Sequence, residues 1–245
     1  MKPTILLLFN SSLYAAQPWL DDGRFNVVSV DYHDTDHHTD SPQQHRHDGA
    51  GHYRINYDLS KPFTVSGLLE ILGGPSYKLD YPALCLSFAP CTDLAVSGAR
   101  HFASKAKANP RFQEVAVIQA RLAEQLDCPY AVENPVSVLS TLWRKPDLYW
   151  HPRDYAGYCP SGLHPEFPSI IPEQDRYNKK SCLWLGNGFV IPRFITLPVL
   201  DEVNPGWAKL GGKSPRTKYI RSLTPRGFAN AVYLANREKV LDNAS

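Results

Sequence analysis

Two short motifs contain residue types that can do chemistry: Ala89-Pro90-Cys91 and Glu133-Asn134-Pro135. Each follows an apolar run typical of a buried strand, at residues 84–88 and 129–132. In a parallel α/β sheet the carboxyl ends of the strands meet at one edge, where ligands bind. We therefore expect the Cys91 thiol and the Glu133 carboxyl to serve one substrate as nucleophile and proton donor. This pairing suits attack on an electron-poor ring that must be protonated first, and cytosine is such a ring.

The role of Cys91 depends on its surroundings, because only the thiolate is a good nucleophile. A helix that begins just after the Pro-Cys turn would lower the pKa of this thiol. The alternative is a buried cysteine that only packs, which is what we expect of Cys85 and Cys128.

Glu133 is poorly explained as a core residue, because a buried carboxylate needs a partner. Partial burial favours the protonated form of a carboxyl group, which can then act as an acid. Asn134-Pro135 is expected to stiffen the turn that aims Glu133. The alternative is a carboxylate at a strand end that faces water.

The elements that must position these motifs alternate between strand and helix, which predicts an α/β fold with a mostly parallel, Rossmann-like sheet and helices on both faces. We expect strands at residues 4–9, 26–30, 53–57, 84–88, 129–132 and 181–185, and helices at 12–20, 66–72, 111–126 and 227–239. Within residues 111–126, the spacing of Val115, Ile118, Leu122 and Leu126 predicts that these apolar residues share one helical face.

The composition is that of an ordinary globular protein: 245 residues, 43% hydrophobic, 20% charged and a net charge of +2. We expect an α/β core at residues 1–143, an irregular insertion at 144–178, and the remaining core strand, a basic segment and a final helix at 179–245. The five cysteines show no CxxC spacing, so neither a zinc site nor a disulfide framework is predicted. A reducing cytosol is the expected location.

Residues 84–98 (LCLSFAPCTDLAVSG) and 132–135 (VENP) resemble the DNA (cytosine-5) methyltransferases, in the short form found in bacteriophages. The resemblance implies a class I methyltransferase fold in the host cytoplasm. It also implies that Cys91 attacks C6 of a flipped-out cytosine in DNA, while Glu133 hydrogen-bonds the base edge and assists at N3. Carbon 5 then takes a methyl group from S-adenosylmethionine. The neighbouring Pro90, Asn134 and Pro135 are expected to contact the substrate.

The family opens on a Phe-x-Gly-x-Gly loop that holds the cofactor, and residues 9–13 of this chain (FNSSL) match only the phenylalanine. The resemblance implies that Phe9, Ser11, Asp31 and Asp58 line the S-adenosylmethionine pocket. The lost glycines leave open a different one-carbon donor. Residues 177–186 (YNKKSCLWLG) resemble the family's Arg-x-Arg segment with lysines in place of arginines, and they suggest Lys180 as a second base contact. Residues 221–229 resemble the C-terminal region of phage members.

DNA contacts are expected from two further segments. Aromatic and cationic side chains alternate from residue 143 onward, a composition suited to stacking and phosphate contact: Trp143, Arg144, Lys145, Tyr149, Trp150 and Arg153. The alternative for them is an ordinary surface loop. Beside a DNA enzyme, phosphate binding is also expected of the basic segment with Lys213, Arg216, Lys218 and Arg221. A catalytically silent DNA-binding homologue remains a further alternative.

One biased segment stands outside the resemblance. Residues 33–52 are rich in histidine but show no ligand spacing, so we expect a solvated, mobile insertion and no metal site.

Overall fold

The computed structural model describes residues 2–10, 12–31, 45–47, 51–56, 64–74, 78–200, 206, 209–211 and 214–243. Its strands form one eight-stranded sheet. They are β1 (Thr4–Leu8), β2 (Asn26–Asp31), β3 (His45–His47), β4 (His52–Asn56), β5 (Pro82–Ser87), β6 (Tyr130–Pro135), β7 (Leu148–Trp150) and β8 (Ser181–Gly186).

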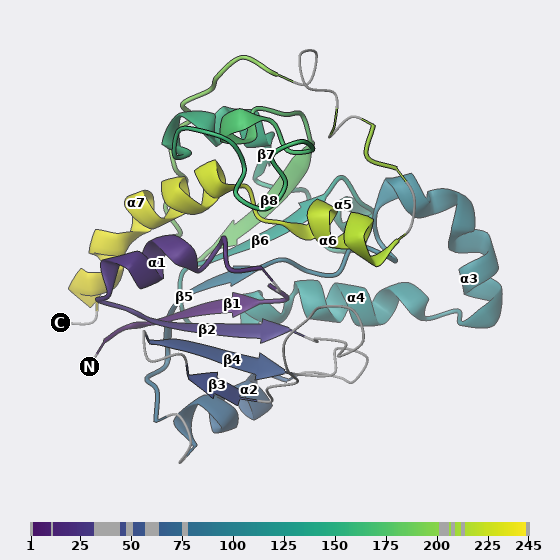
Figure 1. Ribbon diagram of the computed structural model, residues 1–245. Helices are drawn as coiled ribbons and strands as arrows, with labels where there is room; N and C mark the ends of the chain where they lie inside the picture. The colour runs from purple at the N-terminus through teal and green to yellow at the C-terminus, as the bar shows by residue number, and fades with distance from the viewer. Residues whose placement is uncertain are drawn as a thin grey trace.

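The sheet has the order β3-β4-β2-β1-β5-β6-β8-β7 (Figure 1). Strands β4, β2, β1, β5 and β6 are parallel, whereas β8 runs antiparallel between β6 and β7, and β3 runs antiparallel to β4. The sequence TILLL makes β1 apolar on both faces, and all five of its residues are buried, as a central strand requires. The predicted mostly parallel α/β sheet is confirmed.

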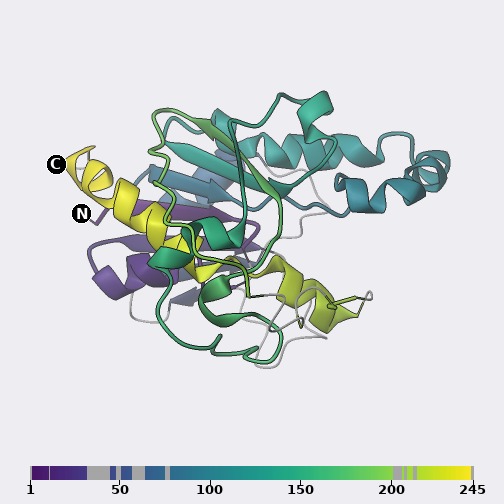
Figure 2. The same ribbon diagram turned by 90° about the horizontal axis from the view of Figure 1, so that it is seen from above.

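Helices cover both faces of the sheet (Figures 1 and 2). On one face, α1 (Gln17–Asp22) and α7 (Arg226–Asn243) bury Trp19 and Phe228 against the strands. On the other face, α2 (Val65–Gly73) and α4 (Phe112–Ala120) contribute residues such as Leu68 to a second core. The remaining helices are α3 (Phe102–Ala108), α5 (Leu139–Leu142) and α6 (Pro215–Ser222). None of the helices in the described part of the chain is long and apolar enough to cross a membrane.

The predicted helix at 111–126 is shorter than expected, and the four apolar residues do not share one helical face. Val115 and Ile118 are 42% and 48% exposed, whereas Ala116, Gln119 and Ala120 are buried. The helix ends at Ala120 and a 3-10 turn follows, so the 3.6-residue period does not continue to the next apolar residues. Leu122 and Leu126 are buried, but Leu122 belongs to the 3-10 turn and Leu126 follows it in an extended conformation.

The segment at 144–178 is irregular, as expected, but it packs tightly onto the core. It contains β7 and 3-10 turns at Pro152–Tyr158 and Glu173–Asp175. Trp150 is only 2% exposed, and its ring stacks on Phe228 of α7 with centroids 4.2 Å apart. The prediction that Trp150 contacts DNA is therefore wrong, because α7 covers its ring.

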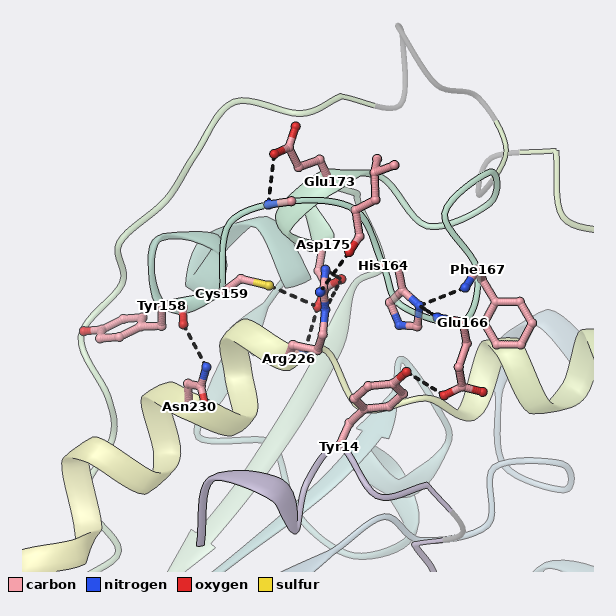
Figure 3. A network of polar contacts seen from close by, with 12 residues as sticks. Tyr14, Tyr158, Cys159, His164, Glu166, Phe167, Glu173, Asp175, Arg226 and Asn230 are labelled. Atoms are coloured by element: carbon pink, nitrogen blue, oxygen red, sulfur yellow. Dashed lines mark hydrogen bonds and ion pairs between the residues drawn. The ribbon is translucent and has the colours of Figure 1, made fainter. Parts of the chain in front are cut away.

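A polar network fixes this insertion to the start of α7 (Figure 3). The Asp175 carboxylate accepts hydrogen bonds from the backbone amide of Arg226 at 2.6 Å and from its Nη2 at 3.1 Å. Nearby, Tyr14 donates to the Glu166 carboxylate at 2.5 Å, which ties the loop after β1 to the same insertion. The insertion is therefore held at Asp175 by the start of α7 and at Glu166 by Tyr14.

Part of the His-rich segment at 33–52 is ordered. Residues 45–47 form β3, and His52 begins β4 with 1% exposure, its Nε2 lying 3.0 Å from Ser29 Oγ. The expectation of a solvated, mobile segment is wrong for His52, because β4 pairs with β2 and draws this side chain into the core. Residues 33–44 and 48–50 lie outside the described part of the chain.

Candidate active site

The Ala89-Pro90-Cys91 turn lies at the carboxyl end of β5, between β1 and β6 in the sheet. Cys91 is exposed, whereas the other four cysteines are buried and all five are free. A turn follows Cys91, in which its carbonyl accepts from the amides of Leu94 and Ala95 at 3.1 and 2.8 Å. The next helical residues begin only at Val96, so the predicted helix N-terminus does not lie directly after the thiol.

The Glu133-Asn134-Pro135 motif is part of a strand and not of a turn, which corrects the sequence prediction. Strand β6 continues through Pro135 and pairs with β8 along its whole length. Asn134 is fully buried, and its Nδ2 donates to the carbonyl oxygen of Ala89 at 2.8 Å. The Asn134 amide therefore holds the turn that carries Cys91, and a substrate contact for Asn134 stays a prediction.

Successive residues of a strand point to opposite faces of a sheet, so Glu133 points away from the face that Asn134 occupies. Glu133 lines a hollow whose walls include Lys179 and Ser181. The remaining walls are the aromatic rings of Phe88, Trp150 and Phe228 and the link between α6 and α7, Ser222, Leu223, Thr224 and Pro225. The hollow thus combines aromatic surfaces with the Glu133 carboxyl and the Lys179 amine.

The lysine that lines this hollow is Lys179, the neighbour of the residue that the sequence suggested. Lys179 Nζ donates to the carbonyl oxygen of Arg221 at 3.0 Å. Lys180 is exposed, and its Nζ lies 4.7 Å from the ring centre of Tyr149. The two side chains diverge because adjacent residues beside a strand alternate in direction. Lys179 therefore lines the hollow and Lys180 does not, and a base contact for Lys180 stays a prediction.

Charges from three segments act on the Cys91 thiol. Burial by the surrounding protein raises its pKa above the ordinary value, and the Glu133 carboxylate raises it further. Lys179 and Arg221 lower it. The residue is nevertheless exposed to solvent, and it is not among the residues that line the hollow. The structure thus brings Cys91, Glu133, Lys179 and Arg221 together, and sequence reasoning had placed only the first two there.

We expect replacement of Lys179 by glutamine to slow alkylation of Cys91 at constant pH. The lost positive charge raises the thiol pKa, and below the pKa each unit of increase reduces the thiolate fraction about tenfold. The rate is measured with iodoacetamide and mass spectrometry of the Cys91 peptide. Lys180→Gln is the matched control and should leave the rate nearly unchanged; equal slowing in both variants would contradict the assignment of Lys179.

The loop after β1 is the candidate place for a cofactor. Phe9 has a φ of 56°, a left-handed conformation that is uncommon outside glycine, and its side chain is buried. Asn10 Nδ2 donates to Thr224 Oγ1 at 3.2 Å, but Asn10 Oδ1 and Ser12 Oγ are buried without a partner. Buried polar atoms are normally satisfied, so these two oxygens could bind polar groups of a ligand.

The other predicted cofactor residues are only partly described. Asp31 ends β2 and is partly buried, at the same edge of the sheet as Phe9. Ser11 and Asp58 lie outside the described residues. Phe9, Asn10, Ser12 and Asp31 are therefore the described residues that could hold a cofactor such as S-adenosylmethionine. Asn10 and Ser12 were not among the predicted pocket residues, although both stand in the loop at residues 9–13 that the resemblance indicates.

A scan against protein-family models finds no match for this chain. A search of curated proteins finds no match either. Function is therefore inferred from the fold and from the side chains that lie at the carboxyl edge of the sheet.

Proposed function

We propose that the protein is a DNA cytosine C5 methyltransferase that acts through a covalent bond between Cys91 and C6 of the base. One observation carries the proposal: Cys91, the single exposed thiol of the chain, directly follows β5, and Glu133 stands near the carboxyl end of the neighbouring parallel strand β6. Nucleophilic attack and proton donation need these two groups on one substrate.

The sheet topology also supports the proposal. The class I methyltransferase fold that the resemblance implies is a mostly parallel, Rossmann-like sheet with helices on both faces, and the observed sheet is compatible with it. Here β8 runs antiparallel between β6 and β7. This strand places Lys179 and Ser181 beside Glu133, so it also forms one wall of the hollow.

The side chains could carry the reaction as follows. The Cys91 thiolate, stabilised by Lys179 and Arg221, forms a bond to C6 of an extruded cytosine. Glu133 hydrogen-bonds the base edge and supplies a proton at N3, which lets the ring accept the electron pair. Carbon 5 then becomes nucleophilic, and S-adenosylmethionine, when bound, supplies the methyl group. Loss of the C5 proton to a base and departure of the thiolate restore the C5–C6 double bond, and the N3 proton returns to Glu133, which leaves a neutral 5-methylcytosine.

Trapping on DNA that contains 5-fluorocytosine tests this function. Fluorine replaces the C5 proton that must leave, so the adduct should persist on a denaturing gel in the presence of S-adenosylmethionine. Cys91→Ser should abolish the adduct, and Cys128→Ala, which alters a buried thiol, should retain it. Absence of an adduct with the unaltered protein, or its persistence in Cys91→Ser, would refute the proposal.

A different one-carbon donor is the second candidate, and the loop after β1 favours it. Phe9 adopts the left-handed conformation, and residues 10–13 contain no glycine through which a backbone could approach a cofactor closely. Titration calorimetry with S-adenosylmethionine separates the two candidates. Only the first requires that this compound binds, so a titration without detectable binding would favour the second.

A further inference from the structure

A group of unpaired cations lies beside the hollow. Helix α6 has the sequence PRTKYIRS, with three basic residues and no acidic one, and Lys218 and Arg221 are both exposed. Within the described part of the chain, neither Lys179, Lys218 nor Arg221 forms an ion pair. Other cations of the protein do have carboxylate partners, for example Lys105 with Asp93.

These cations form a continuous rim. Lys179 Nζ lies 3.0 Å from the carbonyl oxygen of Arg221, and both side chains act on the Cys91 thiol. Lys218 stands three residues before Arg221, so the two share one face of α6. The helix lies beside the tips of the parallel strands (Figure 1), and the link that follows it forms a wall of the hollow. The rim therefore begins at Lys179, in the wall of the hollow, and ends at the exposed side chains of Lys218 and Arg221.

Electrostatics favour an anion on this rim. Like charges that are close together repel each other, and the carboxylate that lines the hollow with Lys179, that of Glu133, forms no ion pair with these cations in the described part of the chain. A bound anion between the cations would relieve the repulsion. A DNA backbone offers a row of anions, and a strand that places one base in the hollow must carry its phosphates past the hollow's edge.

We infer that Lys179, Lys218 and Arg221 form a phosphate-binding rim that holds the backbone of duplex DNA next to the target base. The inference rests on the proposed function, since DNA as the occupant follows from it. It deepens that function by naming the surface along which the target strand runs. Arg216, on the same helix, points elsewhere, with its guanidinium 5.9 Å from the ring centre of Phe167.

Salt-dependent DNA binding tests the rim. Affinity for a short synthetic duplex is measured by fluorescence anisotropy over a range of salt concentrations without cofactor. Lys218→Gln and Arg221→Gln should each reduce the slope of log K against log salt by about 0.9, the value for one lost contact with a B-DNA phosphate. Arg216→Gln removes the same charge from another face of α6 and should leave the slope unchanged. Circular dichroism verifies that each variant is folded.

Two results would overturn the inference: unchanged slopes in Lys218→Gln and Arg221→Gln, or an equal decrease in Arg216→Gln. The measurement needs no methyl transfer, so it is separable from the trapping experiment. Reduced slopes without a 5-fluorocytosine adduct would support the rim and refute the proposed reaction. An adduct with unchanged slopes would refute the rim alone.

Discussion

Replacing Asp175 by alanine is expected to lower the free energy of unfolding by about 3–5 kcal/mol, the usual effect of removing one partner of a buried ion pair. The Asp175 side chain is 2% exposed and that of Arg226 is 11% exposed, and the two are joined at 3.1 Å. Without the carboxylate, the guanidinium would remain buried without its anion. The first backbone amide of α7 would also lose its acceptor. Urea unfolding followed by tryptophan fluorescence measures the loss.

Control variants separate the effect of losing the Asp175 charge from the effect of changing the backbone preference at this position. Asp175 has a φ of 56°, a conformation that asparagine tolerates better than alanine, so Asp175→Asn keeps the backbone and one acceptor and should cost less. Glu173→Gln alters an exposed carboxylate in the same turn and should change stability by no more than about 0.5 kcal/mol. Adding Arg226→Met to Asp175→Ala should recover part of the loss. A loss below about 1 kcal/mol in Asp175→Ala would contradict the expectation.

Much of the sheet could be predicted from the sequence, because its central strands are apolar on both faces. The segments TILLL at β1 and NVVSVD at β2 are buried almost throughout, and such runs are typical of parallel strands. Strand β7 was missed because it has only three residues, and helix α6 because it is short and largely polar. Their stability comes from tertiary contacts, such as the pairing of Trp150 with Ser181, that no local pattern reveals.

In the candidate site too, some residues could be placed from the sequence and others only from the folded structure. Cys91 and Glu133 could be placed together because both follow apolar runs that end at one edge of the sheet. The choice between Lys179 and Lys180 depends on the register of β8 against β6, and a shift of one residue reverses the face that each side chain occupies. Arg221 and Thr224 reach the site from a helix and a link far along the chain, so their proximity follows only from the folded structure.

We expect Glu133→Gln to reduce turnover about 10²–10⁴-fold, the contribution of a positioned proton donor. Glutamine fills the same space and can hydrogen-bond the base edge, but it has no acidic proton for N3. The same substitution should accelerate alkylation of Cys91, since it removes the negative charge that raises the pKa of the thiol. Turnover is measured by transfer of a labelled methyl group to DNA, and alkylation with iodoacetamide on the same preparation.

The two readouts move in opposite directions only if Glu133 acts on the substrate as an acid and on Cys91 as a nearby charge. Glu124→Gln, which alters an exposed carboxylate paired with Arg121, should change neither rate. Unchanged turnover in Glu133→Gln would exclude the acid role. A loss of turnover with slower alkylation would instead mean that the variant disturbs the turn that Asn134 holds. A more reactive thiol in a less active enzyme therefore requires that proton donation to the ring, and not the supply of thiolate, limits the attack.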